Sequence, residues 1–281
     1  MLIICIPICI LGLVGNGMVI LFIHMIKKNK FNVYVMNMAM GDCVVLLYLL
    51  GYFALFVEPA RVNAHTSRFL EITYFLGRNS GFYILTALCA ERYLSLFSPV
   101  WCQRHRPENF SAIVSAILWA FSCVIAFAEE FTCYRRFYAF MNGDTFLCDT
   151  ATVSEFIIDF LIFVPIMVFC TVAIFIKKQG KTQSMLDNTI VATVILFLIF
   201  DGSARLLEYI NYWHDDLVEM PLFTFSVLFD SICSSINPFL YFAIGWWGRQ
   251  KAQETLDIFV ERALNYETNI EQATQADQEK T

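Results

Sequence analysis

Seven apolar stretches separated by short charged gaps are the feature that most limits what this chain can fold into. They cover residues 2–26, 32–57, 68–98, 110–131, 152–177, 185–213 and 220–243. Each is long enough to cross a hydrocarbon layer of ~30 Å as a helix. A 281-residue chain with 58% apolar residues is too apolar for a soluble domain. Continuous apolar blocks also argue against the alternating pattern of a membrane barrel. We therefore predict an all-α membrane protein, a bundle of seven transmembrane helices.

Basic residues mark which gaps face the cytoplasm. They follow the first, third and fifth stretches: Lys27, Lys28, Lys30, Arg104, Arg106, Lys177, Lys178 and Lys181. By the positive-inside rule these gaps are cytoplasmic. The rule predicts an extracellular N-terminus, a cytoplasmic C-terminus and an acidic outer face.

After the seventh stretch the pattern becomes amphipathic. Apolar and charged residues of 246–264 fall on opposite faces of a helix, as in helices that lie on the inner membrane surface against lipid. We assign residues 1–264 to the transmembrane bundle with this eighth helix. Residues 265–281 are polar and are predicted to be a disordered cytoplasmic tail.

An acid and a base stand side by side at the end of the third stretch. Glu91 and Arg92 follow about twenty apolar residues and are followed by Tyr93. One interpretation is a pair of snorkelling charges at the membrane edge. The other is a switch, in which Arg92 is partly neutralised by the adjacent Glu91 and changes partners when helices move.

A second polar set lies inside the bundle. Asp42 falls deep in the second stretch, and a lone buried carboxylate there needs a partner or a proton. Asn16 and Asn237 are candidate partners. Pro238 breaks the hydrogen-bond ladder of the last helix, so Asn237 either bonds the freed backbone or reaches Asp42, and Tyr241 lies nearer the cytoplasm.

Charges also occur in the third and sixth stretches. Asp201, Arg205 and Glu208 are spaced four and three apart, which places them on one helix face that cannot point at lipid. Arg78 lies fourteen residues, or about 21 Å, above Arg92. We hypothesise that Arg78 pairs with Asp201 or Asp159.

Two cysteines flank the loop between the fourth and fifth stretches. Cys133 and Cys148 lie on the predicted oxidising side, 15 residues apart, and a disulfide there would join the outer ends of two helices. The other cysteines are scattered through apolar blocks, and no spacing suggests a metal or cofactor site. A net charge of −6 gives no support for nucleic-acid binding. Four scattered histidines and the lack of a nucleophile beside a base argue against an enzyme.

Several motifs, in order, resemble one known family. They are Gly15-Asn16, Ala39 with Asp42, Glu91-Arg92-Tyr93, Trp119 and Asn237-Pro238-Phe239-Leu240-Tyr241. This series resembles the rhodopsin-like G-protein-coupled receptors. The run from Glu91 to Trp101, followed by Arg104-His105-Arg106-Pro107, is similar to the Mas and Mas-related receptors.

The resemblance implies a plasma-membrane receptor that activates heterotrimeric G proteins through Arg92 and Tyr241. It implies that Cys133 and Cys148 pair with each other. It also implies a peptide or a basic amphiphilic ligand bound at Glu129. Glu155, near the outer end of the fifth stretch, is a second candidate because of its position. From the residues alone, a solvated surface charge is the alternative for either glutamate. Arg78 and Asp201 complete the set of predicted ligand-site residues.

Two departures from the family pattern leave alternatives open. Ser203 stands where most of the superfamily has a proline in the sixth helix, and Asp201 stands at a usually aromatic position. A receptor-like protein that no longer signals, acting as a partner or decoy, is therefore one alternative. A transporter using Asp42, Arg78 and Asp201 is another, although no internal repeat supports it. Gly81 and Cys233 replace polar groups that usually hold sodium near Asp42, so we do not expect a sodium site.

Overall fold

The computed structural model describes residues 2–25, 30–57, 64–133, 145–178, 185–213 and 220–247. The helices in these ranges are α1 (Leu2–Met25), α2 (Lys30–Val57), α3 (Ala64–Phe97), α4 (Pro99–Arg104), α5 (Phe110–Thr132), α6 (Thr145–Phe156), α7 (Val164–Lys178), α8 (Met185–Trp213) and α9 (Met220–Trp247), with the π-helical segment η1 (Ile157–Phe163) joining α6 to α7. The predicted eighth helix at 246–264 and the tail at 265–281 lie outside these ranges, except for Trp246 and Trp247, which end α9.

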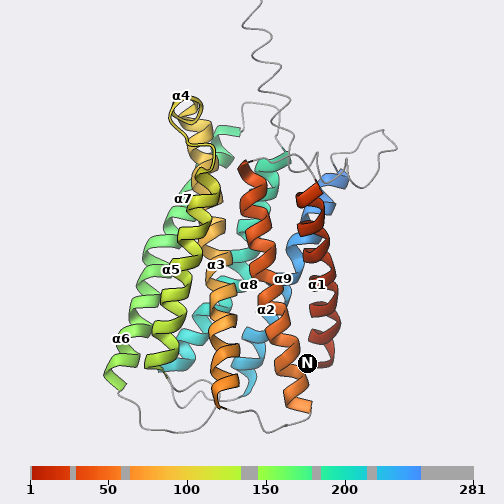
Figure 1. The fold of residues 1–281 in the computed structure, drawn as a ribbon, viewed down its shortest axis with the longest axis vertical. Helices are drawn as coiled ribbons and strands as arrows, with labels where there is room; N and C mark the ends of the chain where they lie inside the picture. Colours follow the sequence, from red (N-terminus) through yellow and green to blue (C-terminus); the bar gives the residue numbers. More distant parts are fainter. Residues whose placement is uncertain are drawn as a thin grey trace, which may run out of the picture.

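The long helices run side by side as one bundle (Figure 1). Counting α6, η1 and α7 as one segment, they make the seven predicted spans. Five are apolar enough along their length to cross a membrane: 4–25, 30–53, 110–132, 146–177 and 186–210. The other two, α3 and α9, carry buried charges such as Arg78 and Asp230. The expected seven-helix bundle is therefore confirmed.

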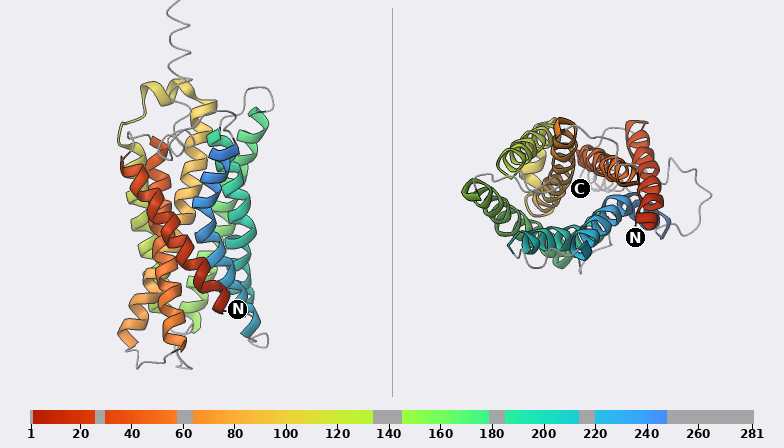
Figure 2. Two further views of the ribbon diagram at one scale, coloured as in Figure 1. Left: turned by 90° about the vertical axis from the view of Figure 1, so that its right-hand side faces the viewer. Right: turned by 90° about the horizontal axis from the view of Figure 1, so that it is seen from below.

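Seen along its axis, the bundle brings the chain's first and last described helices together (Figure 2). α1 packs against both α2 and α9, and α3 packs against α2, α5 and α7. The central position of α3 agrees with its fully buried Tyr83, Ile84 and Leu85. α3 is thus the helix from which a side chain can reach most of its neighbours.

Two glycines allow α2 and α3 to approach closely. A Cβ atom built on Gly41 would lie 2.9 Å from the carbonyl oxygen of Gly77, and one built on Gly77 would lie 2.9 Å from the carbonyl oxygen of Gly41. Backbone atoms cannot move aside for such a contact, so the two positions need residues without a Cβ. Small residues serve this purpose widely in membrane helix pairs.

The two ends of the bundle differ. The short helix α4 lies at one end, here called the α4 end (Figure 1). The Cys133–Cys148 disulfide joins the end of α5 to the start of α6 at the opposite end, here called the disulfide end. The predicted disulfide is therefore confirmed. By the positive-inside rule, the disulfide end is the one predicted to be extracellular.

Candidate functional site

At the α4 end, the two adjacent charges of α3 take partners on different elements. The Arg92 guanidinium donates from Nε to Asp187 Oδ1, at 2.6 Å, and Asp187 lies in the first turn of α8. Both side chains are at least 90% buried. The sequence predicted Glu91 as the neutralising neighbour of Arg92, and the Asp187 partner was missed. A partner across two helices cannot be read from adjacency in the sequence.

Glu91 instead forms the centre of a separate cluster. Its carboxylate accepts hydrogen bonds from the Tyr34 hydroxyl of α2 at 2.6 Å and from Arg106 Nε at 2.8 Å. Ser111 of α5 donates to the same carboxylate at 3.2 Å. Glu91 thus ties the ends of α2, α3 and α5 together and holds the segment after α4. Tyr93 packs its ring on Phe97, with 4.5 Å between the ring centroids.

Midway along the bundle, Asp42 of α2 meets the polar residues of α9. Asn237 Nδ2 donates to Asp42 Oδ2 at 2.9 Å. Of the two alternatives predicted for Asn237, the contact with Asp42 is the one that forms. Asn16 was predicted as a further partner of Asp42. Its amide donates instead to the carbonyl oxygens of Gly12 and Ser234, at 3.0 and 2.8 Å. Asn16 therefore joins α1 to α9 through backbone rather than through the carboxylate.

The end of α9 completes this region. Pro238 is buried beside Gly15 of α1, where a Cβ on the glycine would lie 3.0 Å from the proline ring. Tyr241 is buried with Val19, Ile23 and other apolar residues of α1 and α2.

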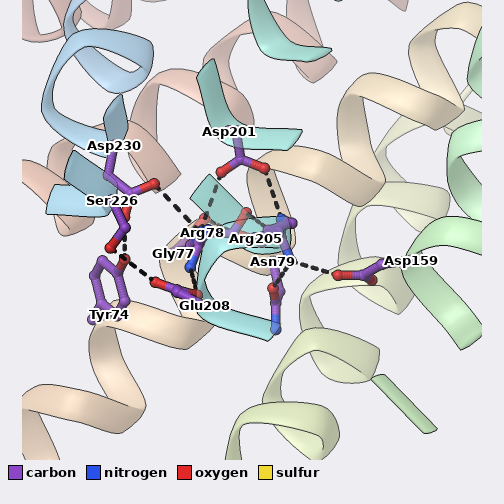
Figure 3. Close-up of polar contacts among 11 residues, drawn as sticks. Tyr74, Gly77, Arg78, Asn79, Asp159, Asp201, Arg205, Glu208, Ser226 and Asp230 are labelled. Atoms are coloured by element: carbon purple, nitrogen blue, oxygen red, sulfur yellow. Dashed lines mark hydrogen bonds and ion pairs between the residues drawn. The ribbon is translucent and has the colours of Figure 1, made fainter. Parts of the chain in front are cut away.

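Farther toward the disulfide end, Arg78 of α3 lies among three carboxylates (Figure 3). It donates from Nε to Asp201 at 3.2 Å and from Nη1 to Glu208 at 2.6 Å, both on α8. Its Nε also lies 3.6 Å from Asp230 of α9. The hypothesised Arg78–Asp201 pair is therefore confirmed, and it clamps α8 to α3.

A second arginine extends the cluster to the fifth span. Arg205 of α8 donates to Asp201 at 2.7 Å, to Asp159 of η1 at 2.6 Å and to the Asn79 amide oxygen at 2.8 Å. Asp159 also accepts from the Tyr83 hydroxyl at 3.0 Å. We call this set the ion-pair cluster: Arg78, Asp159, Asp201, Arg205, Glu208 and Asp230.

Two small hollows border the ion-pair cluster. The first, the Glu155 pocket, has about 30 Å³ of space for water-sized molecules and is lined by Arg78, Thr152, Glu155, Phe156, Asp159, Phe160, Arg205, Glu208 and Tyr209. The second, the Asp42 cavity, has about 20 Å³ and includes Asp42, Arg78, Thr193, Asp201, Asp230 and Asn237 in its lining. Arg78 lines both, so it lies between the Glu155 pocket and the Asp42 cavity.

The described helices match a known family model over most of their length. Residues 15–241 match the model of the 7 transmembrane receptor (rhodopsin family). The chain belongs to this family. Proto-oncogene Mas of Homo sapiens is 33% identical over 266 residues, which cover 91% of this chain and 80% of that protein. Mas-related G-protein coupled receptor member D of Rattus norvegicus is 31% identical over 277 residues, covering 92% and 84%. Member H of Mus musculus is 32% identical over 258 residues, covering 89% and 78%.

The protein is thus a G-protein-coupled receptor of the Mas and Mas-related group, a multi-pass plasma-membrane protein and not an enzyme. In this receptor the four predicted ligand-site residues separate. Arg78 and Glu155 line the Glu155 pocket, and Asp201 lies on the other side of Arg78. Glu129 lines neither hollow.

The placement of Glu129 corrects a prediction. We expected it at the acidic outer face, but its side chain is packed in the bundle, and the residue is 4% exposed. It lies one turn before Cys133, whose backbone N–H donates to the Glu129 carbonyl at 2.7 Å. Glu129 as a ligand contact stays a prediction without an accessible surface to support it.

Three further polar residues of the receptor were missed. Asp230 lies in the seventh apolar stretch, and the same argument that singled out Asp42 applies to it. Tyr74 of α3 donates to the Asp230 carboxylate, and Arg106 holds Glu91. Tyrosines among apolar residues give no such signal, because most of them are simply packed.

Proposed function

We propose that this receptor binds a peptide or basic amphiphilic ligand from the extracellular side and activates heterotrimeric G proteins inside. The observation that carries the proposal is the buried Arg92–Asp187 ion pair, which ties the base of α3 to the first turn of α8. A pair of this kind has two arrangements, formed or broken, and so provides the bistable element that a switch requires.

Breaking the pair frees the Arg92 guanidinium at the α4 end. If α8 moves away from α3 there, Arg92 and Tyr241 come to line a cleft that a G protein can enter. A ligand drives the change only by binding the open state more tightly than the closed one. The ion-pair cluster supplies the connection, because Asp201, Arg205 and Glu208 belong to the same helix as Asp187.

At the other end of α8, the Glu155 pocket is the site that best fits a basic ligand. The Glu155 carboxylate makes no hydrogen bond or ion pair within the described ranges, and it is only partly buried. Phe156 and Tyr209 stack beside it, with 4.3 Å between ring centroids. A carboxylate next to aromatic faces suits an ammonium or guanidinium group through a charge-assisted hydrogen bond and a cation–π contact. The pocket is small, so a ligand enters it with a single basic group.

Screening basic peptides against the receptor in cells, with G-protein activation as readout, tests this function. We expect a peptide that activates the wild type to lose at least about tenfold in potency on Glu155→Gln, since one charge-assisted contact is worth roughly 1.5–3 kcal/mol. Glu129→Gln tests the other predicted ligand contact, and it should respond like the wild type if the Glu155 pocket is the binding site. Loss of response in Glu129→Gln with full response in Glu155→Gln would refute the assignment of the pocket.

The same screen decides the alternative of a receptor that does not signal. The ion pairs that α8 makes in the ion-pair cluster favour a closed bundle. They lie close to the position at which most of the superfamily has a proline. A peptide that binds the purified receptor but activates no member of a G-protein panel would support the partner or decoy role.

A further inference from the structure

The ion-pair cluster holds more acidic than basic groups. Four carboxylates, those of Asp159, Asp201, Glu208 and Asp230, face the two guanidinium groups of Arg78 and Arg205. Among the residues that the structure describes, the cluster therefore has two more carboxylates than guanidinium groups. Uncompensated carboxylates inside a membrane are strongly unfavourable, and such groups take up a proton or a cation instead.

Asp230 is the carboxylate with the weakest compensation. It is 2% exposed, and within the described residues its Oδ1 atom has no hydrogen-bond partner. That atom lies 3.6 Å from Arg78 Nε, which donates to Asp201 at 3.2 Å. Asp201 and Asp230 therefore lie at the same N–H group, which donates its hydrogen bond to Asp201 (Figure 3). Like charges at a shared site favour a proton on one of them.

A second observation comes from the Asp42 cavity. Asp230 lines it, and it has room for about one water molecule. The Thr193 hydroxyl lines the same cavity, is 4% exposed and has no hydrogen-bond partner in the part of the chain that the structure describes. The lining thus offers unused polar atoms to a small hydrogen-bonding species such as a hydrated proton.

We propose that Asp230 binds a proton in the closed bundle and releases it to water when the bundle opens, so that the proton acts as a second, inhibitory ligand. This proposal rests on the proposed function in one respect: opening of the bundle is the step that activates the G protein. The charged and titratable groups around Asp230 are Tyr74 and Arg78 of α3, Asp201 and Glu208 of α8, and Asp42 of α2.

The direction of the effect follows from proton linkage. Opening admits water to Asp230 and lowers its affinity for the proton, so the closed state binds more protons than the open one. Lower pH then favours the closed state, and higher pH favours the open state. With one proton released, the open-to-closed ratio changes by up to about tenfold per pH unit.

Infrared spectroscopy of the full chain in lipid nanodiscs tests the proton site without ligand or G protein. Between about pH 5 and pH 8, we expect the carbonyl band of a protonated carboxylic acid in the wild type. The component of this band that belongs to Asp230 should disappear in Asp230→Asn, which keeps an oxygen to accept from Tyr74. It should remain in Asp42→Asn, the matched control from the same cavity. A wild type without such a band overturns the proposal whether or not the variants fold, and so does a band lost in Asp42→Asn but kept in Asp230→Asn.

Basal nucleotide exchange on a reconstituted G protein tests the consequence. We expect the wild type to lose exchange as the pH falls, and Asp230→Asn to show low exchange that no longer depends on pH. Exchange that rises in acid, or an unchanged pH dependence in Asp230→Asn, contradicts the proposal. A wild type that drives no exchange at any pH refutes the proposed signalling function, while the infrared result still decides the proton site.

Discussion

Two arginines of α3 hold α8 at two depths of the bundle. Arg78 binds Asp201 and Glu208 nearer the disulfide end, and Arg92 binds Asp187 at the α4 end. Because both contacts are ionic and buried, each favours one position of α8 rather than a range of positions. Ion pairs of this kind add specificity, and they cost stability when only one partner is removed.

The Arg78→Ala variant tests how far the ion pairs of Arg78 with α8 stabilise the protein. It leaves Asp201, Glu208 and Asp230 without a shared cation, so we expect the free energy of unfolding to fall by about 3–5 kcal/mol. Thermal unfolding of the detergent-solubilised protein measures the change. Arg104→Ala, at an exposed position of α4, is the control and should unfold like the wild type. An equal melting temperature for Arg78→Ala and the wild type would show that the clamp is unimportant.

Sequence reasoning found some of these partners and missed others for a physical reason. Asp201, Arg205 and Glu208 were placed on one buried face because a single helix has a fixed period. Arg92 pairs with Asp187 and Glu91 pairs with Arg106 because of the way the helices cross. A local sequence pattern does not contain this information. Glu129 was misplaced because a charge near a helix end was taken to face water.

At the scale of helices, the closeness of α2 and α3 depends on two glycines. For Gly77→Ala we expect a loss of about 1–3 kcal/mol in stability, because the new Cβ meets backbone that cannot move. Gly51→Ala is a matched control on α2, where nothing lies within 4 Å of the added atom. It should be neutral or gain up to about 1 kcal/mol from helix propensity. Similar melting temperatures for the two variants would contradict the close-contact account.

The disulfide joins α5 to the segment that carries the Glu155 pocket. Its loop of 15 residues predicts a loss of about 3 kcal/mol when the bond is removed. We expect Cys133→Ser, Cys148→Ser and the double variant to unfold at similar, lower temperatures, because any of them breaks the same bond. A double variant that unfolds at the wild-type temperature would rule out this contribution.

The fifth span contains an irregular, π-helical segment that the apolar pattern of the sequence does not reveal. A proline such as Pro165 removes one backbone hydrogen bond from a helix and bends it. The structure has the π-helical segment η1 directly before α7, with Pro165 as the second residue of α7. Asp159 lies within η1 and reaches Arg205. Local helix type depends on packing around a lost hydrogen bond, so the sequence indicates the place of the irregularity but not its form.

For the whole molecule, the architecture was predictable because the bilayer limits the choice. A chain with seven long apolar blocks satisfies its backbone only as helices or as a closed barrel, and the block pattern excludes the barrel. The pairing of α1 with α9 follows from closing such a bundle, as the views in Figure 2 show. The partners of the buried charges needed the structure.

Nucleotide exchange by purified receptor variants tests the central claim, that the Arg92–Asp187 pair restrains the receptor at rest. With a reconstituted G protein and no ligand, we expect Asp187→Asn to raise basal exchange at least about tenfold. A shift of about 1.4 kcal/mol in the free-energy difference between the closed and open states is enough for this increase. Arg92→Ala should abolish exchange while peptide binding at the disulfide end persists. Basal exchange in Asp187→Asn equal to that of the wild type, together with full exchange in Arg92→Ala, would contradict the account.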